Sequence, residues 1–219
     1  AEAPRFWVYQ NIIGKMIFKS MQKASKIIVQ TNWMKSACVH KAGIRPEKVV
    51  INPPSINVEI KSYFQITQTS LRTFFYPASG VIYKNHELIV NAATLLKKRG
   101  VNDYTVVFTL RGDENQHIAR LYRKVNDRGL PIEFIGTTAR EQVLDYYTRS
   151  VLVFPSYIET FGLPMLEARL HRTPILASDC SSSHEILDGY DRVSFFGTED
   201  AAMLADFMEA KFSEEAIKY

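Results

Sequence analysis

The chain has 219 residues, enough for one large domain or for one domain and part of another. Its apolar content of 46% and charged content of 23% are typical of a globular protein, which excludes the disordered and fibrous classes. No apolar run is long enough to span a bilayer, and no secretory signal leads the chain. The two cysteines and five histidines have no metal-type spacing. We therefore expect a cytoplasmic protein without a metal.

Positive charge is concentrated at the start of the chain. The net charge is +4, but residues 1–61 have a balance of +7 and the remainder a balance of −3. A basic segment can face acidic lipid head groups or nucleic acid, or it can be the solvated face of a helix. We favour the solvated face and expect no nucleic-acid partner, because no nucleic-acid motif is present. Peripheral contact with a membrane stays open.

The first part of the chain predicts a small α/β unit. Apolar residues recur at helical spacing over 5–24, with lysines opposite them, which predicts an amphipathic helix. A short strand, a helix capped by Asn32 and stopped by Gly43, and a second strand follow, over residues 26–31, 32–40 and 48–51. The stretch 55–71 is polar and non-periodic, and we interpret it as a linker.

Strands and helices then alternate regularly. The predicted strands are continuous apolar runs rather than runs in which apolar and polar residues alternate. Together with the alternation of strands and helices, this predicts an α/β fold with a Rossmann-like parallel sheet covered by helices on both faces. The predicted strands are 74–77, 104–110, 132–135, 151–154, 174–177 and 193–196, and the predicted helices are 86–99, 115–128, 139–149, 164–171, 183–188 and 199–211. On such a sheet, ligands bind outside the carboxyl ends of the strands.

The most informative stretch follows the strand 151–154. Gly162, Leu163 and Pro164 open a helix, so backbone N–H groups of about Phe161 to Met165 can face an anion there. Thr160 precedes them, and Glu159 and Glu167 lie on either side of the turn with seven residues between them. Considered alone, Glu159 would be a solvated loop residue, and Glu167 would only complement the dipole of its own helix. With the strand, the glycine and the helix start around them, we favour a ligand site for an anion with hydroxyls, such as a sugar diphosphate.

The segment 76–86 is a second candidate, since it too joins a strand end to a helix. It contains Ser79 and Gly80, and Lys84 can reach phosphates or can be a plain surface lysine. We expect Asn85 to cap the following helix. We expect His86 to be a surface residue of its first turn.

Two further strand ends carry weaker signals. Arg111 can reach a phosphate or an acidic neighbour, and we favour the neighbour. Ile135 and Gly136 can flank a nucleotide base through their backbone. The sequence contains no GxGxxG, P-loop or DxD motif.

Residues 72–200 resemble the family 4 glycosyltransferases, retaining enzymes of GT-B fold. The run PSYIETFGLPMLEA resembles their E-x7-E signature, with Glu159 and Glu167 in its two places, and YPASGVIYKNHELIVNA resembles the first loop and helix of their C-terminal domain. Residues 1–54 resemble the last elements of the N-terminal, acceptor-side domain. The resemblance implies a fragment, with 72–219 as the nucleotide-sugar-binding domain.

The resemblance also implies roles for these residues. Lys84 would neutralise phosphate, Gly162 and Leu163 would donate backbone hydrogen bonds, Glu159 would orient the sugar and Glu167 would hold hydroxyls. Many relatives carry an arginine where this chain has Ser79, so Lys84 and the backbone near Gly162 would hold more of the diphosphate. The implied reaction is retaining transfer of a hexose from a nucleotide diphosphate sugar to a saccharide or lipid-linked acceptor, without metal, in cell-surface polysaccharide or lipopolysaccharide synthesis.

Two other functions stay open at this point. The chain could bind a nucleotide sugar without transferring it, or it could belong to another enzyme of GT-B fold, such as a sugar-nucleotide epimerase. A lysine setting for pyridoxal phosphate, expected of phosphorylases, is not visible in the sequence.

Overall fold

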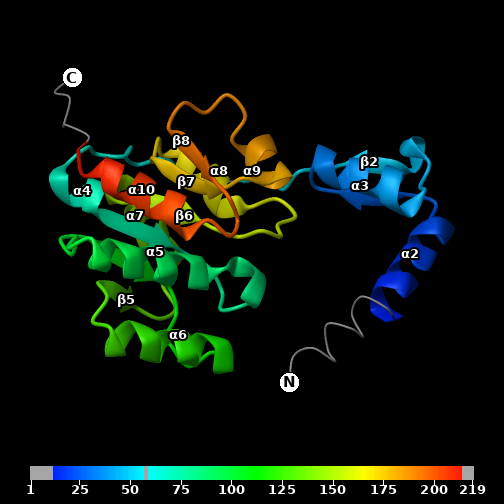
Figure 1. Cartoon of the computed structure of the whole chain (residues 1–219). Coiled ribbons are helices and arrows are strands. Elements are labelled where there is room, and N and C mark those ends of the chain that lie inside the picture. The colour runs from blue at the N-terminus through cyan, green and yellow to red at the C-terminus, as the bar shows by residue number, and fades with distance from the viewer. Residues whose placement is uncertain (1–11, 57–58, 214–219) are drawn as a thin grey trace. The chain divides into compact units, whose positions relative to one another are not determined.

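The computed structural model describes residues 12–56 and 59–213, which divide between two compact units, Ala1–Ile56 and Asn57–Tyr219 (Figure 1). Within the described residues, no helix is both long and apolar enough to cross a bilayer.

The first unit is a small α/β layer built on two parallel strands. Its elements are α2 (Gly14–Lys23), β1 (Ile27–Val29), α3 (Asn32–Ala42), a 3₁₀ turn (Pro46–Lys48) and β2 (Val49–Ile51). Ile27 pairs with Val49, and Val29 pairs with Ile51. The buried residues Val29, Cys38, Ala42, Ile44 and Val49 form its core.

Helix α2 lies within the range 5–24 that was predicted as a helix. Residues 1–11 of that range lie outside the described residues, and α2 covers Gly14–Lys23. Its apolar side chains Met16 and Ile17 are exposed, and none of its residues is buried. The next helix ends as predicted, because Gly43 takes the left-handed backbone with φ 64°. Thr31, not Asn32, occupies the N-cap position.

The second unit alternates strands and helices as the sequence predicts. Its elements are α4 (Gln68–Arg72), β3 (Thr73–Tyr76), a 3₁₀ turn (Ile82–Lys84), α5 (His86–Lys98), β4 (Thr105–Phe108), α6 (Gln116–Asp127), β5 (Ile132–Phe134), α7 (Arg140–Arg149), β6 (Val151–Phe154), α8 (Leu163–Leu170), β7 (Ile175–Ser178), α9 (Ser181–Ile186), β8 (Val193–Phe196) and α10 (Ala201–Lys211).

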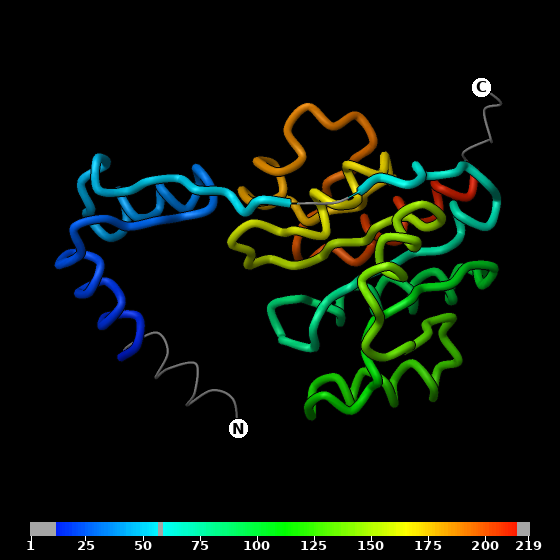
Figure 2. Tube along the Cα trace, turned by 180° about the vertical axis from the view of Figure 1, so that it is seen from behind, coloured from blue at the N-terminus to red at the C-terminus, as the bar shows by residue number. Residues whose placement is uncertain are grey.

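The strands form one parallel six-stranded sheet in the order β5-β4-β3-β6-β7-β8. The chain moves from β3 outward to β5, then returns to β6 and moves outward the other way, so the direction reverses between β3 and β6. Because parallel crossovers are right-handed, α5 and α6 cover one face and α7 and α8 the other. Helix α10 packs on α5, and α9 packs on α8 (Figures 1 and 2).

The central strands are buried on both faces. All four residues of β6 and all four of β7 are buried, as apolar runs in a two-sided parallel sheet require. Aromatic rings fill much of the core, and Phe74, Phe75 and Tyr76 of β3 are fully buried. This packing fixes the strand ends from which the loops of the candidate site project.

The stretch predicted as a linker, 55–71, belongs in part to the second unit. Its last residues form α4, which begins with a capping box between Thr67 and Ser70. Leu71 is buried, and the backbone N–H of Phe64 donates to the carbonyl of His171 at 2.8 Å. The sequence signal failed here because a short helix of Thr, Ser and Gln has almost no apolar periodicity.

Candidate functional site

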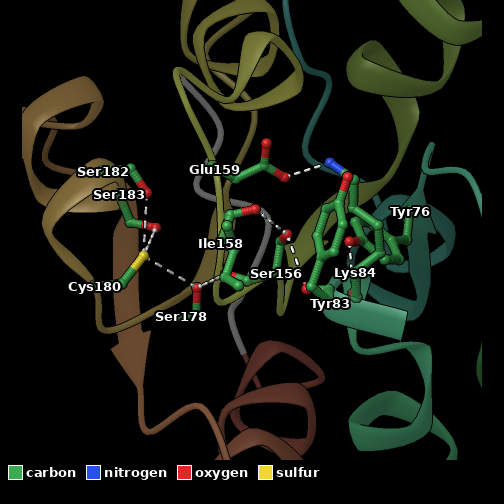
Figure 3. Close-up of polar contacts among 10 residues, drawn as sticks. All are labelled: Tyr76, Tyr83, Lys84, Ser156, Ile158, Glu159, Ser178, Cys180, Ser182 and Ser183. Carbon is green, nitrogen blue, oxygen red and sulfur yellow. Dashed lines mark hydrogen bonds and ion pairs between the residues drawn. The ribbon is translucent and has the colours of Figure 1, made fainter. Parts of the chain in front are cut away.

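The candidate site lies where the loops after β3 and β6 meet. These strands are neighbours at the point where the strand order reverses, which is the usual ligand crevice of an open parallel sheet. Lys84 comes from the first loop and Glu159 from the second, and Nζ lies 2.5 Å from Oε1 (Figure 3). Their side chains are only 19% and 10% exposed. The structure thus brings together the two residues predicted to act on the donor.

The start of α8 supplies backbone donors beside this pair. Gly162 has φ 87°, and a Cβ there would lie 2.4 Å from Met165 Cε. The N–H of Met165 donates to the carbonyl of Gly162 at 3.0 Å, and Pro164 has no N–H. Of the predicted run from Phe161 to Met165, Pro164 and Met165 therefore offer no N–H to an anion, and those of Gly162 and Leu163 remain at the helix start. Phe161 is buried and Thr160 is exposed.

Glu167 lies in a different ion pair from Glu159. It is 5% exposed, its Oε1 lies 2.8 Å from Nη2 of Arg140, and its Oε2 accepts the hydroxyl of Tyr147 at 3.2 Å. Arg140 opens α7 and is half-exposed. This partner was not predicted from the sequence, because Arg140 lies at the start of another helix and no spacing rule links it to Glu167.

A cavity of about 340 Å³ reaches Arg140 of this pair but is not lined by Glu167. Arg140, Leu144, Thr148 and His171 contribute to its lining. A larger cavity of about 490 Å³ lies at the amino ends of the strands. Its lining includes Thr73 and Thr105, the first residues of β3 and β4. That cavity is remote from the strand ends at which ligands bind.

The glycine-bearing loop after β3 has a packing role. A Cβ at Gly80 would lie 2.7 Å from Cγ1 of Ile118, so only glycine lets this loop lie directly on α6. Asn115 caps α6 through Oδ1 and donates from Nδ2 to the carbonyl of Gly80 at 2.7 Å. Ser79 is exposed beside it. Gly80 therefore shapes the loop, while Ser79 faces outward.

Arg111 pairs with an acidic neighbour, as favoured from the sequence. Its Nε lies 3.4 Å from Asp113, and the side chain is mostly exposed. Its loop is held by Glu114, which accepts the N–H of Arg111 at 2.6 Å and that of Gly112 at 3.1 Å. Burial alone would raise the pKa of Glu114, but these backbone donors hold it below its usual value.

The predicted base-flanking residues lie next to Arg111. A Cβ at Gly136 would lie 3.2 Å from Cγ of Arg111, and Gly136 has φ 76°. The N–H of Gly136 donates to the carbonyl of Leu110 at 2.9 Å, and that of Ile135 donates to Phe108 at 3.0 Å. Both N–H groups are thus bonded to backbone carbonyl groups at the end of β4. A contact with a nucleotide base would therefore use the carbonyl groups of Ile135 and Gly136 or the exposed side chain of Ile135.

One prediction about the start of α5 holds in position only, and another is wrong. Asn85 occupies the N-cap position as expected, but its side chain does not cap the helix: the residue takes the left-handed backbone with φ 58°, and its amide donates to two other loops. His86 is not a surface residue but is 1% exposed, packed against Tyr76 and Phe108. Sequence periodicity cannot locate such a residue, because β3 and β4 supply the rings that bury it.

The buried His86 is expected to make the protein acid-sensitive. Burial, together with His117 and Lys84 nearby, lowers its pKa from 6.5 to about 3, and a hydrogen bond to the backbone of Ala78 opposes this only in part. Below pH 6.5, His86 is therefore protonated in the unfolded chain but stays neutral in the native state. The free energy of unfolding consequently decreases as the pH falls from 6.5 towards 3. One such proton contributes about 1.4 kcal/mol per pH unit.

Urea unfolding at pH 7, 6 and 5 tests this expectation. His86→Phe keeps an aromatic ring and should flatten the pH dependence relative to the unchanged chain, while the exposed His184→Asn should not. Equal slopes for the unchanged chain and His86→Phe would contradict the assignment.

Among the described residues, no three His, Cys, Asp or Glu side chains form a metal-binding group. The expected independence from metal stays a prediction.

A protein-family comparison matches most of the chain. Residues 61–216 match the family described as "Glycosyl transferases group 1". A D-inositol 3-phosphate glycosyltransferase of Pseudarthrobacter chlorophenolicus is 26% identical over 209 residues, which cover 89% of this chain and 49% of that protein. The O-antigen chain mannosyltransferase RfbU of Salmonella typhimurium is 24% identical, covering 83% of this chain and 51% of RfbU. The chain thus spans about half the length of these relatives.

Solved structures share the fold. The crystal structure of TarM superposes with a TM-score of 0.74 at 18% identity, covering 91% of this chain and 39% of TarM. Anabaena Alr3699/HepE, solved with UDP and glucose, gives a TM-score of 0.71 at 14% identity and covers 91% of this chain and 57% of that one. The expected α/β architecture of GT-B type is confirmed.

Proposed function

The chain belongs to the glycosyl transferases of group 1, and we propose that it carries the donor site of an enzyme that moves a sugar from a nucleoside diphosphate to an acceptor. The observation that carries the proposal is the largely buried pair of Lys84 and Glu159 at the reversal of strand order, beside the free N–H groups that open α8. A cation and aligned N–H groups suit a diphosphate, and a neighbouring carboxylate suits sugar hydroxyls.

Lys84 and the start of α8 contact the diphosphate, and the two glutamates contact the sugar or ribose. Lys84 neutralises the departing diphosphate, and the N–H groups of Gly162 and Leu163 hydrogen-bond its oxygens, so catalysis is electrostatic. Glu159 fixes the orientation of the sugar and also keeps the Lys84 ammonium in place before the donor arrives. Glu167, ordered by Arg140 and Tyr147, holds ribose or sugar hydroxyls with its remaining lone pairs.

We assign a hexose donor, retention of anomeric configuration, no metal cofactor and a saccharide or lipid-linked acceptor. The names of the mannosyl and inositol phosphate glycosyltransferase relatives support a sugar donor and a hydroxyl acceptor, and RfbU supports a place in cell-surface polysaccharide synthesis. The reaction then belongs in the cytoplasm, at the inner face of the membrane where the acceptor is lipid-linked.

A second candidate function is donor binding without transfer by this chain alone. It is favoured by one observation: the chain spans about half the length of its curated relatives. Donor binding and sugar release, measured on the same sample, separate the two functions.

Calorimetry with UDP, GDP, ADP and their hexose conjugates tests the proposal. We expect one base to bind, and we expect Lys84→Ala to weaken that binding by about 10- to 100-fold, because it removes a charge-assisted contact to phosphate. Lys97→Ala is the matched control, since Lys97 lies on α5 and bonds the carbonyl groups of Arg128 and Gly129 far from the site. Equal affinities for Lys84→Ala and the unchanged chain would refute the donor site.

A further inference from the structure

Asn85 sits at a junction of three loops. Its Nδ2 donates to the carbonyl of Pro155 at 3.2 Å, just after β6, and to the carbonyl of Thr198 at 2.8 Å, after β8. Asn85 itself follows the 3₁₀ turn that carries Lys84. One amide group therefore ties the Lys84 turn to the loop that leads into Glu159 and to the segment that returns the chain to α10.

The backbone of Asn85 is also unusual. It has φ 58° and ψ 38°, and Arg172 is the only other non-glycine residue with positive φ in the described parts of the chain. Glycine adopts this conformation most readily, and asparagine is among the few other residues that tolerate it. An asparagine here combines the left-handed turn with a side chain that donates two hydrogen bonds, which glycine cannot provide.

Other hydrogen bonds hold the same turn from its remaining sides. The hydroxyl of Tyr76 donates to the carbonyl of Lys84 at 2.7 Å, and burial raises the pKa of Tyr76, so this hydroxyl stays protonated. The carbonyl of Tyr83 accepts from Ser156 Oγ at 3.2 Å (Figure 3). It also accepts from the N–H of Tyr157 at 3.2 Å. The main chain on either side of the Lys84 side chain is therefore fixed.

We propose that Asn85 is a positioning residue: by joining the carbonyl groups of Pro155 and Thr198 to the Lys84 turn, it holds the Lys84 ammonium against Glu159 and towards the diphosphate. This inference rests on the proposed function for its effect on donor binding. Its effect on the geometry of Lys84 stands without any ligand. Asn85 acts through Lys84 and does not itself touch the donor.

The test separates the side chain of Asn85 from its backbone. Asn85→Gly keeps the left-handed turn and removes both amide bonds, so the fold should survive, and thermal unfolding of the variant checks this. We expect its affinity for whichever of UDP, GDP and ADP binds to fall about tenfold. Asn85→Asp, which tolerates the same backbone but offers no N–H, should lose at least as much. Asn102→Gly is the control, because the one side-chain bond of Asn102 to the described residues is a 3.4 Å contact within its own turn.

A double substitution distinguishes positioning from general loosening. If Asn85 acts through Lys84, Lys84→Ala and Lys84→Ala/Asn85→Gly should bind equally weakly, since the second change has nothing left to position. An independent further loss of tenfold in the double variant would overturn the proposal. So would an unchanged affinity in Asn85→Gly when Lys84→Ala is weakened.

A measurement without ligand tests the positioning role of Asn85 even if the proposed donor site is wrong. Lys84 is largely buried against Glu159, so its acetylation by acetic anhydride, mapped by mass spectrometry, should be slow. Asn85→Gly should accelerate it severalfold, and Asn102→Gly should not. An unchanged acetylation rate would overturn the positioning role, whereas indifference of UDP, GDP and ADP binding to Lys84→Ala would overturn only the proposed function.

Discussion

Gly162→Ala is expected to destabilise the second unit and to abolish most donor binding. Alanine at φ 87° carries a backbone strain of about 1–2 kcal/mol. Its Cβ would also lie 2.4 Å from Cε of Met165, which is fully buried, and repacking that side chain costs about 1 kcal/mol or more. A chain that relieves the contact by moving the turn also moves the N–H groups of Gly162 and Leu163 away from the diphosphate.

A second glycine isolates these effects. Gly189 also has positive φ, but a Cβ there would meet nothing within 4 Å. Gly189→Ala should therefore show the backbone cost alone in urea unfolding and should leave calorimetric binding of the preferred nucleoside diphosphate unchanged. If the two variants lost equal stability and equal affinity, the turn before α8 would have no special part in the site.

The sheet could be predicted from the sequence because its strands are continuous apolar runs. Residues 151–154 have no polar position, and glycines such as Gly100 and Gly129, just past α5 and α6, predicted the helix ends. The short helix α4 could not be predicted, because its residues Gln68 to Ser70 are polar and its burial comes from packing against α7 and β6. Local periodicity says nothing about such tertiary packing.

The candidate site could be predicted in part. Lys84 and Glu159 were each assigned to the donor site from the sequence, but their meeting follows from the adjacency of β3 and β6, which only the structure supplies. The pairing of Glu167 with Arg140 and Tyr147 was missed, because these side chains come from another helix and no spacing rule links them. The burial of His86 and the hydrogen bonds from the Asn85 amide to Pro155 and Thr198 were not predicted for the same reason.

The pair of Arg140 and Glu167 yields the second large effect. Arg140→Met leaves a carboxylate that is 5% exposed with the hydroxyl of Tyr147 as its remaining described partner, and we expect a loss of about 1–3 kcal/mol in the free energy of unfolding. Arg149→Met is the control, because Arg149 pairs with Asp145 on the exposed side of the same helix. Exposed pairs of this kind contribute below about 1 kcal/mol.

Glu167→Gln shows whether the charge of Glu167 is the cause. Glutamine still accepts the Tyr147 hydroxyl but carries no charge, so Arg140→Met should cost much less in the Glu167→Gln background than in the unchanged chain. The difference between the two costs of Arg140→Met, measured as free energies of unfolding in urea, gives the interaction energy between Arg140 and Glu167. Equal costs in both backgrounds would mean that Arg140 stabilises α7 by packing alone, and Glu167 would then reach the donor without being ordered by Arg140. Since one carboxylate serves both the ion pair and the donor, Glu167→Gln should also weaken binding of the preferred nucleoside diphosphate sugar while leaving the fold intact.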